Sequence, residues 1–91
     1  MYEILTTSRF EKDLIRAKKR GKEMSALAIL LQLLENGEPL PDKYKNHKLQ
    51  NVFPETWDCH IQPDWLLLYE IDKGRKLVKL KRTGSHADLF K

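Results

Sequence analysis

The chain has 91 residues, of which 41% are hydrophobic and 33% are charged, and its formal net charge is +4. This balance excludes a disordered chain, and the length suits one domain, residues 1–91, that buries roughly 60–65% of its extended surface. A single cysteine, Cys59, excludes a disulfide framework and a multi-thiolate zinc site. The chain shows neither a signal-peptide pattern nor an apolar run of membrane length, so we expect a cytoplasmic protein that does not contact membranes.

The first part of the chain predicts a strand followed by two helices. Residues 2–6 are rich in aromatic and β-branched types, which favours a strand. Ser8 and Glu11 have the spacing of a capping box, and apolar side chains recur at helical spacing over residues 9–20. A second leucine-rich helix follows and ends at Gly37, a residue suited to a helix C-cap. We expect these two helices to form a hairpin.

A proline-containing connection leads from the helices to the next strand. Residues 38–45 hold two prolines, which exclude a helix interior and predict an extended crossing. A strand then begins at Trp57, because apolar and polar residues alternate there. This alternation directs Cys59 to one face, and Asp58 and His60 to the other. We therefore expect Cys59 to be a buried packing residue.

The last part of the chain predicts two more strands. Residues 65–69 form a continuous apolar run, as in a central strand with both faces covered. Residues 72–74 predict a turn, and residues 77–82 predict the returning strand, with Arg82 on the same face as Leu80. The predicted fold is α+β: an N-terminal strand and a two-helix hairpin packed on an antiparallel twisted sheet, with a short C-terminal helical turn.

Polar residues that can carry acid–base chemistry gather in the sheet half. They are His47, Asp58, His60, Asp64, Arg82 and His86. Histidines beside a carboxylate supply a general acid, a general base and an orienting partner. An arginine fork fits phosphate oxygens, and the aromatic rings of Trp65 and Phe90 offer faces on which bases stack. The pattern favours RNA cleavage without a metal ion.

Each of these residues also has a purely structural interpretation. His47 equally suits a solvated surface, Asp64 a turn, and Arg82 a pair with an acidic residue. Trp65 and Phe90 equally suit a hydrophobic core. No spacing of histidines and carboxylates in the chain matches a zinc signature. The residues alone leave these alternatives open.

Three runs of sequence occur together in register. They are YKNHKLQ at 44–50, WDCHIQPDWLLLYEI at 57–71 and LKRTGSHADLF at 80–90. Together they resemble the YafQ branch of the RelE/ParE toxin superfamily, and the resemblance covers nearly the whole chain. It implies a RelE-like fold and a toxin that cleaves mRNA in the A site of translating ribosomes without a cofactor. It also implies three kinds of partner: a DinJ-like antitoxin, the 70S ribosome with its mRNA, and operator DNA only through the antitoxin complex.

The resemblance implies roles for individual residues. His86 would be the general acid to the leaving 5′ oxygen, Asp64 or His60 would take the 2′ proton, and His47 would orient the substrate. The product would carry a 2′,3′-cyclic phosphate or a 3′ phosphate. The RNA-binding residues would be Arg82, Trp65, Phe90 and Lys81. Asn51 and Trp57 depart from the pattern, since relatives often carry glycine and a basic residue there.

Basic residues also cluster at the end of the first helix. They are Arg16, Lys18, Lys19, Arg20 and Lys22. Such a cluster is either a solvated face or a surface whose affinity for RNA weakens with salt, and an acidic antitoxin would cover it. Two other functions stay open, a ParE-like gyrase-inhibiting toxin and a catalytically inactive module that binds the antitoxin.

Overall fold

Five strands form one sheet within residues 1–90, the part of the chain that the computed structural model describes. They are β1 (Glu3–Thr6), β2 (His47–Lys48), β3 (Thr56–Gln62), β4 (Trp65–Asp72) and β5 (Leu77–Gly84), in the spatial order β1-β5-β4-β3-β2. The helices are α1 (Ser8–Lys19), α2 (Met24–Asn36) and α3 (His86–Phe90), and η1 (Asp42–Tyr44) is a 3-10 turn. The predicted α+β fold and the short C-terminal helix are confirmed.

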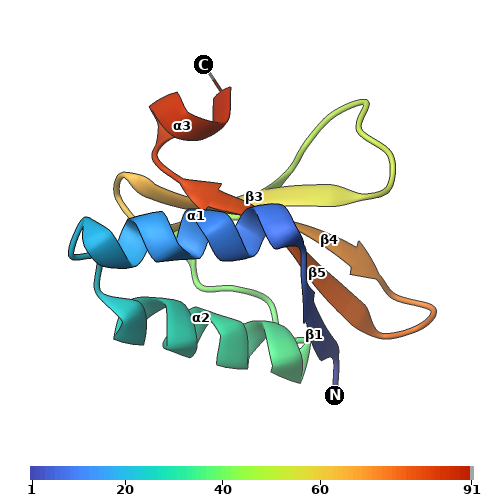
Figure 1. Cartoon of the computed structure of the whole chain (residues 1–91). Coiled ribbons are helices and arrows are strands. Elements are labelled where there is room, and N and C mark those ends of the chain that lie inside the picture. Colours follow the sequence, from blue (N-terminus) through green and yellow to red (C-terminus); the bar gives the residue numbers. More distant parts are fainter. Residues whose placement is uncertain (91) are drawn as a thin grey trace.

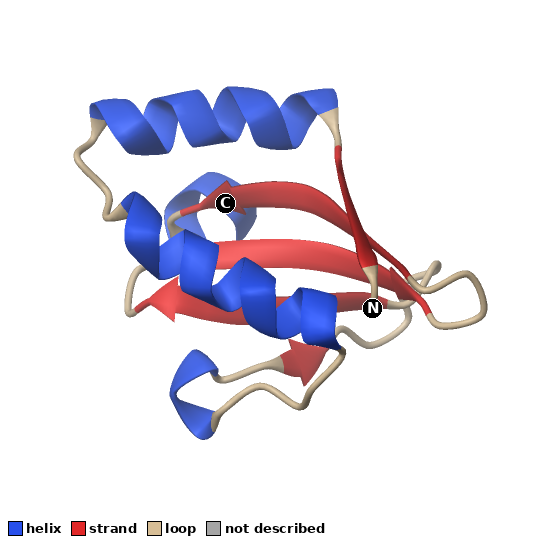
Figure 2. Cartoon of the chain, turned by 90° about the horizontal axis from the view of Figure 1, so that it is seen from below, coloured by secondary structure: helices blue, strands red, loops and turns tan. Residues whose placement is uncertain are grey.

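The helices divide between the two faces of the sheet. Helix α2 lies across one face and contacts β3, whereas α1 packs along β5 at the edge of the sheet (Figure 1 and Figure 2). The short α3 lies beyond the end of β5, on the other side of the sheet from α2 (Figure 2). Much of one sheet face is therefore left without a helical layer. No helix in residues 1–90 has the length and apolar character needed to cross a membrane.

The sheet is mixed, which corrects the prediction of an antiparallel sheet. Strands β2 to β5 pair antiparallel, but β1 runs parallel to β5, with Glu3 opposite Leu77 and Thr6 opposite Leu80. The β4–β5 hairpin leaves the outer edge of β5 unpaired, and β1 satisfies the backbone groups of that edge. Strand direction at this edge depends on a pairing between chain ends, which local residue patterns do not encode.

The start of α1 differs by one residue from the predicted capping box. The N-cap is Thr7, whose hydroxyl accepts a hydrogen bond from the Phe10 N–H at 3.0 Å. Glu11 instead accepts a hydrogen bond from the Thr6 hydroxyl at 2.6 Å. Thr7 and Ser8 are both good N-cap residues, so the sequence alone does not distinguish them.

The connection after α2 is more ordered than predicted. The helix ends at Gly37, which adopts the left-handed φ of +69° that was expected of a C-cap glycine. The chain then forms η1 instead of a wholly extended crossing, and the two residues of β2 add a short edge strand beside β3. This edge strand brings His47 onto the sheet.

Side chains from α1, α2 and the helix-covered face of the sheet form the core. Its most buried members include Phe10, Leu30, Leu67 and Tyr69, each at most 2% exposed. Cys59 is fully buried among them, and burial raises the pKa of its thiol to about 12. The expectation that Cys59 is a packing residue is confirmed.

A β-bulge interrupts β5 and redirects its C-terminal part. Tyr69 lies opposite Leu80, but the preceding residue, Leu68, lies opposite Arg82, so Lys81 is an extra residue in β5. A bulge of this kind breaks the alternation of side chains along a strand. The predicted placement of Arg82 on the same face as Leu80 is therefore wrong.

Candidate active site

A row of directly opposed residues crosses the sheet near the end of β5 that leads into α3. His47 of β2 lies opposite Asp58 of β3, Asp58 lies opposite Leu68 of β4, and Leu68 lies opposite Arg82 of β5. His60 is two residues from Asp58 along β3, so both belong to the face of the sheet that α1 and α2 leave uncovered. Residues far apart in the sequence thus meet on one sheet face.

The adjacent row brings in the third histidine. His60 lies opposite Leu66, and Leu66 lies opposite Gly84 at the end of β5. The chain continues from Gly84 directly into α3, whose first residue is His86. The Phe90 ring, one helical turn later, lies 5.1 Å from the His86 ring between centroids, at an interplanar angle of 41°.

The Asp58 carboxylate, which is only 6% exposed, lies opposite His47 of β2 and two residues from His60 on the same strand face. Asp58 Oδ2 lies 3.5 Å from His47 Nε2, while Oδ1 has no hydrogen-bond partner among residues 1–90. Burial raises the pKa of the Asp58 carboxyl, and the charges of all three histidines act in the opposite direction. The family resemblance assigns Asp58 no role, although strand alternation places it on the same face as His60. That alternation is the sequence signal that identifies it.

Backbone carbonyls fix which ring nitrogens carry protons. His60 Nδ1 lies 3.1 Å from the Pro63 carbonyl oxygen, so Nδ1 donates and the Nε2 of a neutral ring has a free lone pair. His47 Nδ1 lies 3.0 Å from the Lys45 carbonyl oxygen, and its Nε2 faces Asp58. Both nitrogens of His47 therefore face oxygen atoms, of the Lys45 carbonyl and of the Asp58 carboxylate.

Asp64 and Trp65 lie at the hairpin that joins β3 to β4. Asp64 is exposed in the turn, at the end of the strand that carries His60. Trp65 is 1% exposed and packs in the core, because strand alternation directs the first residue of β4 toward the helices. A buried ring has no face on which a base can stack, so the expected RNA contact of Trp65 is corrected to a core role.

The two basic side chains of β5 that were expected to bind RNA, Arg82 and Lys81, both pair with carboxylates of this chain. Arg82 Nε and Nη2 donate to the two carboxylate oxygens of Asp13 in α1, at 2.9 and 3.1 Å. The Thr83 N–H donates to the same carboxylate at 3.2 Å. Lys81 Nζ lies 3.0 Å from a Glu70 carboxylate oxygen. The guanidinium fork expected to hold the scissile phosphate is thus occupied by Asp13.

A hollow of about 480 Å³ adjoins the histidine cluster. His60 lines it together with Tyr44, Ile61 and Pro63, and its volume lies within the usual range for small-ligand pockets. The exposed side chain of Lys43 also lines it. Ala26 and Ile29 of α2 complete the lining, so this hollow extends from His60 toward the helix side of β3.

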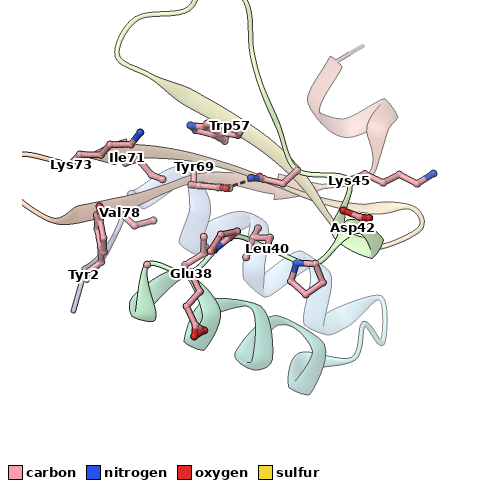
Figure 3. Close-up of a pocket in the computed structure, with 15 residues that line it drawn as sticks. Tyr2, Glu38, Leu40, Asp42, Lys45, Trp57, Tyr69, Ile71, Lys73 and Val78 are labelled. Carbon is pink, nitrogen blue, oxygen red and sulfur yellow. Dashed lines mark hydrogen bonds between the residues drawn. The ribbon is translucent and has the colours of Figure 1, made fainter.

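A second hollow of about 510 Å³ lies on the helix side of the sheet (Figure 3). Trp57, Tyr69 and Leu40 line it, and the Tyr69 hydroxyl donates to Asn46 Oδ1 at 2.6 Å. Burial raises the pKa of Tyr69, so its hydroxyl keeps its proton. No histidine lines this hollow, and the acid–base groups are on the other face.

Comparisons with known proteins identify the family. The family model described as "Bacterial toxin of type II toxin-antitoxin system, YafQ" matches residues 2–91. The mRNA interferase toxin YafQ of Escherichia coli K12 is 42% identical over 89 residues, which cover 97% of this chain and 95% of that protein. A putative toxin YafQ from Haemophilus influenzae is 33% identical over 86 residues, 89% of this chain and 84% of that protein.

Solved structures match the fold along the whole chain. YafQ in a DinJ–YafQ complex from E. coli is 41% identical, covers 100% of both chains and superposes with a TM-score of 0.91. A metal-bound toxin from Helicobacter pylori is 38% identical, with coverage of 99% and 100% and a TM-score of 0.92. The resemblance that the sequence motifs indicated is confirmed: the chain belongs to the YafQ family of toxins from type II toxin–antitoxin systems.

Proposed function

We propose that this chain is a ribosome-dependent mRNA endonuclease that cleaves RNA with its own acid–base groups. The observation that supports this most strongly is the buried Asp58 carboxylate on the uncovered sheet face, which lies 3.5 Å from His47 and is influenced by the charges of His60 and His86. The E. coli relatives are named mRNA interferases, and YafQ of E. coli forms a complex with DinJ. The partners of this chain would be an acidic antitoxin, the ribosome and its mRNA, and operator DNA only through the antitoxin complex. Its place of action would be the cytoplasm.

His60 is the best-placed general base in this proposal. Its Nδ1 proton is held by the Pro63 carbonyl, and its Nε2 lone pair is free to accept the proton of a ribose 2′-hydroxyl. Asp64 is the alternative base, since it is exposed at the end of the same strand.

His86 supplies the general acid. It is exposed at the start of α3, so a leaving 5′ oxygen can reach it, and the Phe90 ring packs against one side of its imidazole. One well-placed acid or base contributes roughly 10²–10⁴ in rate. The product would be a 2′,3′-cyclic phosphate, or the 3′ phosphate formed from it, and a 5′ hydroxyl.

His47 and Asp58 stabilise charge in the transition state. His47, positioned between the Lys45 carbonyl and Asp58, would stabilise the negative charge that develops on the phosphorane. Asp58 keeps His47 in place. Because Asp13 occupies the fork of Arg82, the phosphate depends more on the histidines than the sequence indicated.

The mechanism contains no metal-dependent step. The H. pylori relative is metal-bound, but in this chain no three side chains of His, Cys, Asp or Glu within residues 1–90 converge as ligands for one ion. We therefore assign no metal ion to the histidines in this proposal. A chelator arm in the cleavage experiment tests this point separately.

The test is primer-extension mapping of a reporter mRNA in a reconstituted translation reaction. Wild type is compared with His86→Ala, with and without ribosomes, and with a chelator of transition metals present in a parallel arm. Ala87→Ser, at the next position of α3, is the control for a general disturbance of the helix. Circular dichroism establishes that each variant is folded.

We expect in-frame cuts that need ribosomes, persist with the chelator, persist in Ala87→Ser and vanish in His86→Ala. Cuts in the absence of ribosomes would contradict ribosome dependence but would leave the nuclease activity itself in place. Absence of cuts from folded wild type would overturn the nuclease proposal and favour the gyrase-inhibiting or the binding-only function.

A further inference from the structure

The Asp88 carboxylate links α3, the helix that carries His86 and Phe90, to the end of α1. Asp88 Oδ2 accepts a hydrogen bond from Arg20 Nη1 at 2.7 Å, and Arg16 Nη1 lies 3.8 Å from Oδ1. Arg16 lies in the last turn of α1, and Arg20 is its C-cap residue. The C-terminal end of α1 is therefore tied to α3, although the two helices are far apart in the sequence.

The same carboxylate also caps α3. The Ser85 N–H donates to Asp88 Oδ2 at 2.9 Å, and the Asp88 N–H donates to the Ser85 hydroxyl at 3.1 Å, which is a reciprocal capping box. Gly84, which precedes Ser85, leaves room for the Asp88 carboxylate, since a Cβ on residue 84 would lie 3.0 Å from an Asp88 oxygen. Asp88 thus joins the start of α3 to its contact with α1.

A helix as short as α3 cannot hold its own position. It has five residues, whereas helices shorter than about 12 residues are marginal in isolation because nucleation is costly. No side chain of α3 is fully buried, so hydrophobic packing does little to fix it. The contacts of Asp88, together with the direct connection to β5, therefore help to fix where α3 presents His86.

The Arg20–Asp88 pair is on the surface, and Arg20 is exposed. The hydrogen bond from Arg20 lowers the pKa of Asp88, which keeps the carboxylate ionised. Exposed ion pairs add little to global stability. Loss of this pair should therefore free α3 without unfolding the sheet.

We propose that Arg20 is a positioning residue that acts through Asp88 to hold α3, and with it His86, at the reacting phosphate. This inference rests on the proposed role of His86 as general acid. It reassigns Arg20 from the basic RNA-binding cluster expected from the sequence to a contact within the protein. The neighbouring Lys19 makes no ion pair within residues 1–90 and provides a matched control of equal charge.

The first test concerns the free protein and needs no activity. Fast amide-exchange NMR compares wild type, Arg20→Ala, Arg20→Lys and Lys19→Ala. We expect the Asp88 and Leu89 amides of α3 to exchange several-fold faster in Arg20→Ala, to recover partly in Arg20→Lys and to stay unchanged in Lys19→Ala. Unchanged exchange in Arg20→Ala would overturn the proposal.

The second test separates positioning from RNA affinity. In single-turnover cleavage at saturating ribosomes, Arg20→Ala should lower the rate constant about 10-fold, less than the roughly 10²–10⁴ lost in His86→Ala. Lys19→Ala should lose less of the rate constant than Arg20→Ala, because the contacts to Asp88 come from Arg16 and Arg20. In a His86→Ala background, Arg20→Ala should remove nothing further, because both act through one group.

Equal rate constants for Arg20→Ala and Lys19→Ala, or a full additional loss in the His86→Ala background, would contradict the positioning role. Failure of the proposed function gives a different result. Folded wild type would then cut nothing, and the exchange measurement would still decide whether Arg20 holds α3.

Discussion

Asp58 and His47 face each other across strands β3 and β2, with Asp58 Oδ2 at 3.5 Å from His47 Nε2. The carboxylate is buried, and its second oxygen has no partner among residues 1–90. Burial raises the pKa of Asp58, so its ionised form is costly to the folded state. The ionised Asp58 therefore lowers the free energy of unfolding, while its negative charge acts on His47.

Asp58→Asn should stabilise the fold at neutral pH. A carboxyl with a raised pKa contributes stability below its ordinary value of 3.8 and loses that contribution as pH rises through the folded-state pKa. Asparagine removes the ionisation, so the gain in free energy of unfolding should be larger at pH 7 than at pH 4. Denaturant unfolding at both pH values measures it, with the exposed Asp64→Asn as control. A variant less stable than wild type at pH 7 would contradict this account.

The same substitution should lower cleavage. Asn cannot supply the negative charge that faces His47 Nε2, and loss of an interaction with a charged group costs about 1.5–3 kcal/mol. Such a loss corresponds to about 10- to 100-fold in rate. Single-turnover cleavage at saturating ribosomes measures it, and a wild-type rate from folded Asp58→Asn would exclude a role for this carboxylate.

Arg82→Ala should destabilise the protein by about 3 kcal/mol, because it leaves the Asp13 carboxylate buried with only the Thr83 N–H as partner. Denaturant unfolding measures this effect. The double variant Asp13→Asn/Arg82→Gln removes both charges and should recover part of the loss. If Arg82→Ala keeps wild-type stability but loses cleavage, the guanidinium binds the phosphate after all.

The two aromatic residues expected to bind RNA should respond differently to truncation. Trp65→Ala removes a ring that is 1% exposed and should lower the free energy of unfolding by about 3–5 kcal/mol. Phe90 is 43% exposed, so Phe90→Ala should change stability by less than about 0.5 kcal/mol while reducing cleavage. Paired unfolding and cleavage measurements check this, and strong destabilisation by Phe90→Ala would show that its ring is structural.

Local periodicity was sufficient to predict much of the fold. Alternation along β3 separated the buried Cys59 from Asp58 and His60, and the helical spacing of leucines located α2 and its end at Gly37. These features depend on residues a few positions apart. The same alternation also contained the evidence for Asp58, whose pairing with His47 becomes clear only once β2 is placed beside β3.

Features that depend on distant pairing could not be predicted. The parallel direction of β1 is set at the edge of a hairpin formed later in the chain. The bulge at Lys81 has no local signature, and the Asp13 partner of Arg82 lies 69 residues away. The ion pair between Arg20 and Asp88, which lie 68 residues apart, could not be predicted either, because Arg20 belongs to a run of basic residues.

Attack by the ribose 2′-hydroxyl is the step that distinguishes this chemistry from hydrolysis by water. Once a cut is mapped, a synthetic mRNA with one 2′-deoxynucleotide at that position can be translated in the same reaction. The control carries the deoxynucleotide one position upstream. Cleavage should disappear only where the cut nucleotide lacks its 2′-hydroxyl, and the normal product should end in a cyclic or 3′ phosphate. Equal cleavage of both templates would contradict acid–base catalysis by the histidine cluster.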